Sequence, residues 1–152
     1  MSLSWEINRG GVLNVMKLNE TFQIDNSLEG LDELKTHLNR IAASWGLSKK
    51  ILFETNIIIE EICTNYMEHV EHNLHSPVEV ELCLKDNILL IVITETGPKF
   101  DPTKTSKPDI HLPLEERKAG GLGLYLVQYY ADSISYTRKK NTNILSVTKI
   151  IK

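Results

Sequence analysis

Two successive amphipathic helices constrain the fold of this chain more than any other feature. From residue 28 to residue 45, apolar side chains recur at steps of three and four, with Ser27 placed to cap the start and Gly46 the end. A second helix with the same kind of stripe begins at Ser48 and runs to about residue 73. Each helix is expected to bury one side and expose the other. The predicted core-facing residues are Leu28, Leu31, Leu34, Leu38, Ile41 and Trp45 in the first helix, and Ile51, Ile58, Ile62, Tyr66 and Val70 in the second.

Predicted strands flank these helices, and most are joined by hairpins. Alternating apolar and polar residues predict an N-terminal hairpin whose strands, 12–18 and 21–25, lie on either side of Asn19-Glu20. Two more β-rich runs, 78–84 and 88–94, are joined by three turn residues. The second of these runs is nearly all apolar, which is typical of a central strand.

The last part of the chain adds one helix and one hairpin. A third helix is predicted over about 122–131, followed by strands over 133–137 and 144–150. The helices are therefore grouped apart from strands that are joined mainly by hairpins. This order predicts an α/β (α+β) two-layer sandwich, in which a mixed, mostly antiparallel sheet is covered on one face by about three helices.

A long loop separates the central strands from the third helix. Residues 97 to 120 contain Pro98, Pro102, Pro108 and Pro113 and show no sustained periodicity. A loop of this length inside a compact domain is uncommon, and it is usually either a functional lid or disordered. We therefore expect a lid over about residues 97–120.

The size and charge of the chain exclude several classes of function. Its 152 residues, 41% of them hydrophobic, fit one domain over residues 1–152. A net charge of −3 argues against a nucleic-acid partner, and no apolar run is long enough to span a bilayer. Cys63 and Cys83 suit a reducing compartment, and both are expected to be small core residues. We expect a soluble, cytoplasmic protein that binds neither nucleic acid nor membrane.

Glu61 and Asn65 are the first candidates for chemistry. They lie four residues apart on the second helix, so they project from one face, beside the core stripe. A carboxylate there can act as a general base toward a hydroxyl or water, and an amide oxygen can join phosphate oxygens and waters around Mg²⁺. Asn56 and Glu60 have the same spacing, however, and a solvated helix face is the ordinary explanation of either pair.

Two further segments carry candidate ligand contacts. Glu95 and Gly97 follow the central strand, where a carboxylate would face a ligand between sheet and lid, although a strand-ending turn also explains them. Gly120-Gly121-Leu122-Gly123 opens the third helix, where free N–H groups and the helix dipole favour phosphate, although paired glycines also form ordinary tight loops. Arg117 could reach a terminal phosphate or could simply be solvated in its charged stretch.

In this order, the three segments resemble the GHKL (Bergerat-type) ATPase superfamily, and within it the bacterial anti-sigma factor serine kinases. Glu61 to His69 is similar to the N box, an E-x-x-x-N pattern followed by Glu-His. Gly97 to Pro102 is similar to the G1 box, and Gly120 to Val127 matches the G2 box almost letter for letter. Ala131 to Ile134 resembles the short turn that follows it. The resemblance extends over about residues 27–149 and implies the Bergerat ATP-binding fold, a histidine-kinase-like ATPase domain with a lid loop.

The resemblance implies ATP and Mg²⁺ as cofactors and a role for each matching residue. Glu61 would be the general base and Asn65 the Mg²⁺ ligand. Residue 95 would accept a hydrogen bond from the adenine amino group, and Gly97 would let the base stack closely. The residues that would contact the phosphates under the lid are Gly121, Leu122 and Gly123.

Glu95 departs from the family, which has Asp at this position. The additional methylene carries the carboxylate about 1.5 Å further, so that Glu95 would have to tilt or act through a water to reach adenine. ATP affinity is the property that this difference affects.

The resemblance implies a protein serine/threonine kinase that phosphorylates an anti-anti-sigma partner and sequesters a sigma factor, with a homodimer as a reasonable assembly. Glu95 favours an alternative, a protein-binding regulator of the same fold whose nucleotide affinity is weak or lost. A detached ATPase domain of a sensor kinase is a third alternative. The closer match to the stand-alone anti-sigma kinases argues against it.

Overall fold

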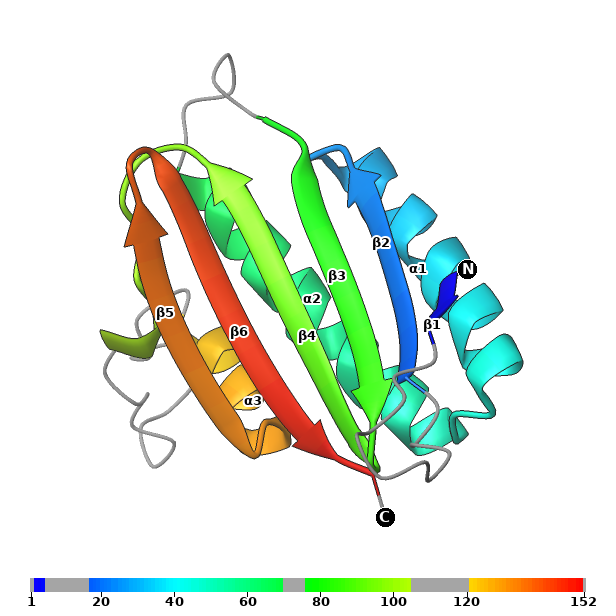
Figure 1. Cartoon of the computed structure of the whole chain (residues 1–152). Helices are drawn as coiled ribbons and strands as arrows, with labels where there is room; N and C mark the ends of the chain where they lie inside the picture. Colours follow the sequence, from blue (N-terminus) through cyan, green and yellow to red (C-terminus); the bar gives the residue numbers. More distant parts are fainter. Residues whose placement is uncertain (1, 5–16, 70–75, 105–120, 152) are drawn as a thin grey trace.

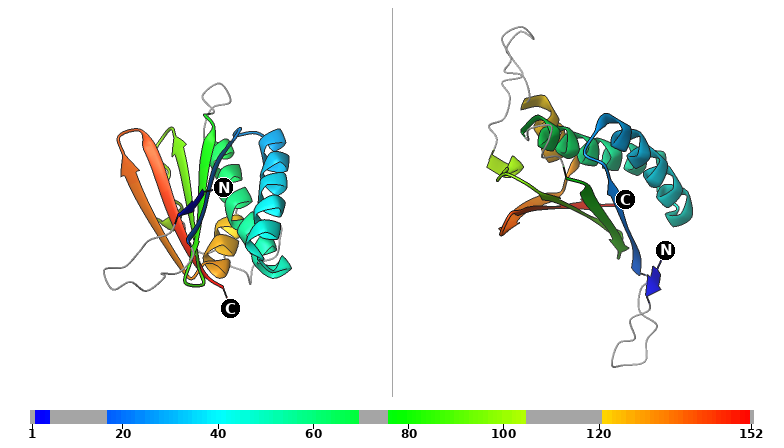
Figure 2. Two further views of the ribbon diagram at one scale, coloured as in Figure 1. Left: turned by 45° about the vertical axis from the view of Figure 1, so that its right-hand side comes forward. Right: turned by 90° about the horizontal axis from the view of Figure 1, so that it is seen from above.

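Six strands and three helices form two layers in the computed structural model, which describes residues 2–4, 17–69, 76–104 and 121–151 (Figure 1). The helices all cover the same face of the sheet, as the view from above shows (Figure 2). The predicted two-layer sandwich is therefore confirmed. The helices are α1 (Leu28–Trp45), α2 (Lys49–His69) and α3 (Gly121–Tyr130), and a short 3₁₀ turn covers Pro102–Lys104.

The sheet has the order β1-β2-β3-β4-β6-β5, and each of these neighbouring pairs is antiparallel. The apolar strand β4 lies in the interior of the sheet, as its sequence predicts. Asp86 and Asn87 form the tight turn before it and have φ values of 51° and 61°. Short polar residues tolerate this left-handed region. The strands are β1 (Ser2–Ser4), β2 (Lys17–Ile24), β3 (Val78–Lys85), β4 (Ile88–Thr96), β5 (Ser133–Lys139) and β6 (Thr142–Ile150).

The two long helices begin where their capping residues predict. The hydroxyl of Ser27 accepts a hydrogen bond from the N–H of Gly30 at 3.2 Å, and Ser48 does the same for Ile51 at 3.2 Å. Gly46 ends α1 in the left-handed conformation, with φ 66°. The described part of α2 ends at His69, and the predicted continuation over residues 70–73 lies outside the described residues.

The predicted N-terminal hairpin is wrong. Strand β2 runs through Asn19-Glu20 without a turn and pairs with β3 along residues 18–24. The carboxylate of Glu20 forms an ion pair with Arg40 of α1, and this hydrogen bond lowers the pKa of Glu20. An acidic residue is thus accommodated within the strand by a partner from the helical layer. Residues 12–16 of the predicted first strand lie outside the described residues.

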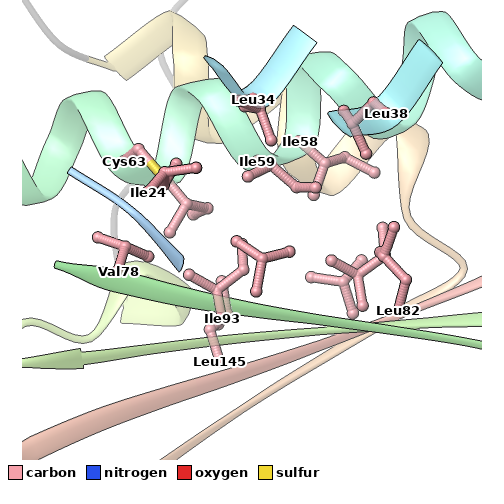
Figure 3. Close-up of a cluster of buried hydrophobic side chains, with 14 of the residues drawn as sticks. Ile24, Leu34, Leu38, Ile58, Ile59, Cys63, Val78, Leu82, Ile93 and Leu145 are labelled. Carbon is pink, nitrogen blue, oxygen red and sulfur yellow. The ribbon is translucent and has the colours of Figure 1, made fainter. Parts of the chain in front are cut away.

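The hydrophobic core lies between the sheet and the helices (Figure 3). Ile58 and Ile59 of α2 point toward the strands, where Ile93 and Leu145 lie, and all four are fully buried. The core residues labelled in Figure 3 are Ile24, Leu34, Leu38, Ile58, Ile59, Cys63, Val78, Leu82, Ile93 and Leu145.

Two residues predicted to face the core do not. Leu28 is 74% exposed, because at 100° per residue it lies about 100° around the helix from the centre of the stripe formed by the later apolar residues. Cys83 is only partly buried, because strand alternation turns it away from the buried Leu82 and the helices. Val70 lies outside the described residues. Among the helices of the described ranges, none has the length and apolar character needed to cross a membrane.

We expect Ile58→Ala to lower the free energy of unfolding by about 3 kcal/mol, because it leaves a cavity where α2 meets the sheet. Ile58 is 0% exposed, whereas Ile88 is 43% exposed and provides the matched control. Ile88→Ala should cost less than about 1 kcal/mol. Urea denaturation followed by circular dichroism measures both values. Equal losses for the two variants would contradict the assigned core.

Candidate functional site

Helix α2 contacts both of the other predicted segments, the start of α3 and the segment that follows β4. Gly123, in the first turn of α3, lies directly against the side chain of Glu61 from α2. Phe100, in the segment after β4, packs edge-on against Tyr66 of α2, with ring centroids 5.7 Å apart. The structure therefore brings together side chains that lie far apart in the sequence.

The contact between Glu61 and Gly123 requires glycine. A Cβ atom built on Gly123 would overlap Oε2 of Glu61 and would lie 2.8 Å from its Cδ. Any other residue would displace the carboxylate from its present position. The first N–H groups of a helix have no partner within the helix and favour anions. Glu61 thus places a carboxylate beside the end of α3 that is suited to phosphate.

Asn65 lies one turn after Glu61 and is 5% exposed. Its amide nitrogen donates to the backbone carbonyl oxygen of Glu61 at 2.6 Å, which orients the amide group. The neighbouring pair of the same spacing behaves differently, since Asn56 donates from its side chain to the carboxylate of Glu60 at 2.9 Å. The ordinary surface explanation therefore holds for Asn56 and Glu60, while Asn65 is buried next to the candidate base.

Burial raises the pKa of Glu61, because the charged carboxylate loses hydration there. The negative charges of Glu60 and Glu68 raise the pKa of Glu61 further. A carboxylate with a raised pKa holds a proton more firmly than an ordinary surface glutamate. This property suits a group that takes a proton from a substrate hydroxyl near neutral pH.

Glu95 is a buried carboxylate at the end of β4, and it is 1% exposed. Its Oε2 accepts a hydrogen bond of 2.9 Å from the side-chain amide of Asn143. Its Oε1 has no hydrogen-bond partner among the described residues. A Cβ built on Gly97 would overlap this same oxygen, so the glycine makes room for it. A buried acceptor without a donor is costly, and a ligand N–H at this place would satisfy it.

Sequence reasoning missed Asn143, which is fully buried opposite Glu95 in the β4–β6 register. It lies on the helix-facing side of β6, two residues before the buried Leu145. A polar residue in an apolar alternation is the one signal that could have pointed to it. Its acidic partner comes from 48 positions away, so the sequence alone does not connect the two.

The predicted phosphate end of the site includes residues that lie outside the described ranges. Arg117, Gly120 and residues 105–119 of the predicted lid lie outside the described residues. Gly121 begins α3, and Leu122 beside it is 52% exposed. The arrangement as a whole offers a carboxylate beside a helix N-terminus, a buried amide one helical turn from that carboxylate, and a buried acceptor at the end of β4.

Comparison with known families gives one match over most of the chain. Residues 24–149 match the family described as "Histidine kinase-like ATPase domain". Serine-protein kinase RsbW of Bacillus cereus (strain AH820) is 29% identical over 115 residues, which are 73% of this chain and 71% of the relative. Serine/threonine-protein kinase BtrW of Bordetella bronchiseptica is 26% identical over 113 residues, 73% of this chain and 79% of the relative.

Two solved structures share the fold at low sequence identity. The RsbU and RsbW domains of Rv1364c from Mycobacterium tuberculosis align with a TM-score of 0.62 and 12% identity, covering 88% of this chain. This chain spans only 32% of that longer chain. The SiaB-SiaC complex from Pseudomonas aeruginosa aligns with a TM-score of 0.58 and 11% identity, covering 87% of this chain and 89% of the other. Both alignments support the fold.

We expect the carboxyl group of Glu61 to titrate above its ordinary value of 4.5 in the folded protein. Because the pKa is raised on folding, the free energy of unfolding should fall as pH rises from 4.5 through the folded pKa. The variant Glu61→Gln has no carboxyl group at this position, so it should lack this part of the pH dependence of the free energy of unfolding. Carbon-detected NMR of the glutamate carboxyl groups measures the midpoint. Glu60→Gln should lower the midpoint, and a wild-type value at or below 4.5 would contradict the assigned burial.

Proposed function

Because the chain belongs to the histidine kinase-like ATPase (GHKL) family, we propose that it binds ATP with Mg²⁺ and phosphorylates a serine or threonine of a partner protein. The observation that carries this proposal is the carboxylate of Glu61 against Gly123, at the start of α3. A carboxylate beside a helix N-terminus, which favours anions, is an arrangement that suits phosphoryl transfer to a hydroxyl. Two relatives named as protein kinases add support.

The residues present fit ATP and Mg²⁺ at both ends of the site. At the base end, Oε1 of Glu95 is a buried acceptor without a described donor, and Gly97 leaves room beside it. At the phosphate end, we assign the N–H groups of Gly121, Leu122 and Gly123 to the phosphates. Asn65 supplies an amide oxygen, the hard type of ligand that Mg²⁺ takes together with phosphate oxygens and waters.

In the proposed reaction, the terminal phosphoryl group would pass from bound ATP to the hydroxyl oxygen and ADP would leave, while Mg²⁺ would balance the negative charge of the phosphates. Glu61 accepts the proton that the attacking hydroxyl loses, and its raised pKa lets it hold that proton. Asn65 is tied to the backbone of Glu61, so the Mg²⁺ ligand and the base keep a fixed relation. Catalysis is therefore mostly positioning. We propose that Arg117 and the lid over residues 97–120 also contact the phosphates.

The proposed protein partners follow from the relatives and from the resemblance of the boxes. We propose an anti-anti-sigma protein as the phosphorylated substrate and a sigma factor as the sequestered partner, with a homodimer as the assembly. One structural neighbour, the SiaB-SiaC complex, is an assembly of two proteins, which supports a protein partner for this fold. We place the protein in the cytoplasm on the same grounds.

Glu61→Gln should abolish phosphotransfer while ATP binding stays within about threefold, because the amide cannot take the proton and has nearly the same size. Glu33→Gln, on the exposed side of α1, is the control and should keep full turnover. Transfer of labelled phosphate to the purified partner measures the rate. Undiminished turnover in Glu61→Gln would show that the assigned base is wrong.

Isothermal titration with Mg-ATP and with ADP separates the kinase from the regulator with weak or lost nucleotide binding. We expect saturable binding of both nucleotides at micromolar to millimolar concentration, because the acceptor of Glu95 and the start of α3 are both in place. If no heat is measured at millimolar nucleotide, the proposed kinase activity is overturned and the alternative, a protein-binding regulator that has lost nucleotide binding, is supported.

A further inference from the structure

We propose that Asn143 is a positioning residue that aims the carboxylate of Glu95 and so decides which atom of residue 95 faces the base in the nucleotide site. The inference rests on the proposed nucleotide site and extends it to a residue outside the three sequence boxes. Asn143 touches Glu95 directly, and its effect on a ligand would pass through that carboxylate.

The side chain of Asn143 is fixed in one orientation by the groups around it. Its Oδ1 accepts hydrogen bonds from the hydroxyl of Tyr136 at 2.7 Å, the guanidinium of Arg138 at 2.7 Å and the N–H of Phe100 at 3.3 Å. An oxygen surrounded by three donors cannot exchange places with the amide nitrogen, because N–H groups would then face N–H groups. The nitrogen must therefore point away from these donors, toward Glu95.

The Nδ2 atom of Asn143 carries two hydrogens, and each is donated to a different acceptor. It donates to Oε2 of Glu95 at 2.9 Å and to the carbonyl oxygen of Pro98 at 2.8 Å. The same amide thus holds the carboxylate and the loop that follows Gly97. Arg138 adds a second restraint on this loop, because its other nitrogen donates to the carbonyl oxygen of Gly97 at 3.0 Å.

This geometry explains how a glutamate can serve at the position where the G1 box that the sequence resembles has an aspartate. The longer side chain has one more rotatable bond, so a free carboxylate would lose more entropy when it met a ligand. The bond to Asn143 removes that freedom before any ligand arrives, which is preorganisation. The same hydrogen bond occupies Oε2, so Oε1, which lies beside Gly97, is the oxygen that can accept a hydrogen bond from a ligand.

The chemical consequence is a preference for a base whose edge donates a hydrogen bond to residue 95. A carboxylate oxygen only accepts, so Oε1 of Glu95 favours the 6-amino group of adenine over the 6-carbonyl of hypoxanthine. If residue 95 were an amide, the donor Asn143 would claim its oxygen and leave its nitrogen facing the ligand. Asn143 therefore decides which atom of residue 95 meets the base.

Glu95→Gln tests this directly with ADP and IDP, which share ribose and phosphates and differ in the base. Wild type should favour ADP, with a ratio of dissociation constants, IDP over ADP, of about ten or more, the usual worth of a charge-assisted hydrogen bond. In Glu95→Gln, Asn143 should hold the amide oxygen, and the ratio should fall about tenfold or invert.

The double variant Glu95→Gln/Asn143→Asp supplies the decisive comparison. An aspartate at position 143 would keep an oxygen for Tyr136 and Arg138 and would present an acceptor to residue 95. The glutamine at position 95 should then turn its nitrogen toward position 143 and its oxygen toward the ligand, so that the preference for ADP returns. A residue that only stabilised the fold would not reverse the base preference in this way. Thermal melting without nucleotide reports the fold of each variant.

Each outcome of the titrations decides the inference. A ratio that falls in Glu95→Gln and recovers in the double variant supports it. A ratio unchanged in Glu95→Gln, or equally low in the double variant, overturns the role of Asn143 while leaving nucleotide binding intact. If the double variant does not fold, Glu95→Gln/Asn143→Ser removes the amide donor with a smaller side chain, and its ratio should rise above that of Glu95→Gln. Wild type that binds neither nucleotide overturns both this inference and the proposed function.

Discussion

Helix α2 has to serve two environments along its length, and the rest of the structure depends on this constraint. Ile58 and Ile62 are completely buried, and they fix the rotation and height of the helix against the sheet. Glu61 precedes Ile62 by one residue, so a turn of about 100° carries it from the core to the boundary beside α3. The candidate base is therefore positioned by hydrophobic packing, and its partial burial is also what raises its pKa.

The two site glycines have a use that their sequence context did not indicate. Sequence reasoning gave Gly97 and Gly123 the task of making room for a ligand. In the structure, each makes room for a carboxylate of the chain itself, Gly97 for Glu95 and Gly123 for Glu61. An acidic side chain can lie this close to a backbone only where no Cβ intervenes. Glycine thus determines where the two carboxylates lie, whichever ligand follows.

Local patterns predicted most of the fold, and long-range contacts account for what they missed. The limits of α1 follow from Ser27 and Gly46, since capping is decided within four residues. The turn expected at Asn19-Glu20 is absent because both residues pair with β3, and Glu20 finds a partner in Arg40 of the helical layer. At the site, the boxes identified Glu61 and Glu95, whose roles stay predictions. They could not identify Asn143, because strand register alone places it opposite Glu95.

The pairing of β4 with β6, which places Asn143 opposite Glu95, also bears on the glutamate that stands where the resembled family has an aspartate. A glutamate in place of aspartate, considered alone, argues for a weakened nucleotide site. A buried carboxylate that lacked partners would destabilise the fold, yet Glu95 has one oxygen bonded to Asn143 and one beside Gly97. Asn143 is in turn bonded to the guanidinium of Arg138. The longer side chain is therefore embedded in a polar network and is not isolated in the core, and its Oε1 is the one oxygen of this carboxylate that lacks a donor among the described residues.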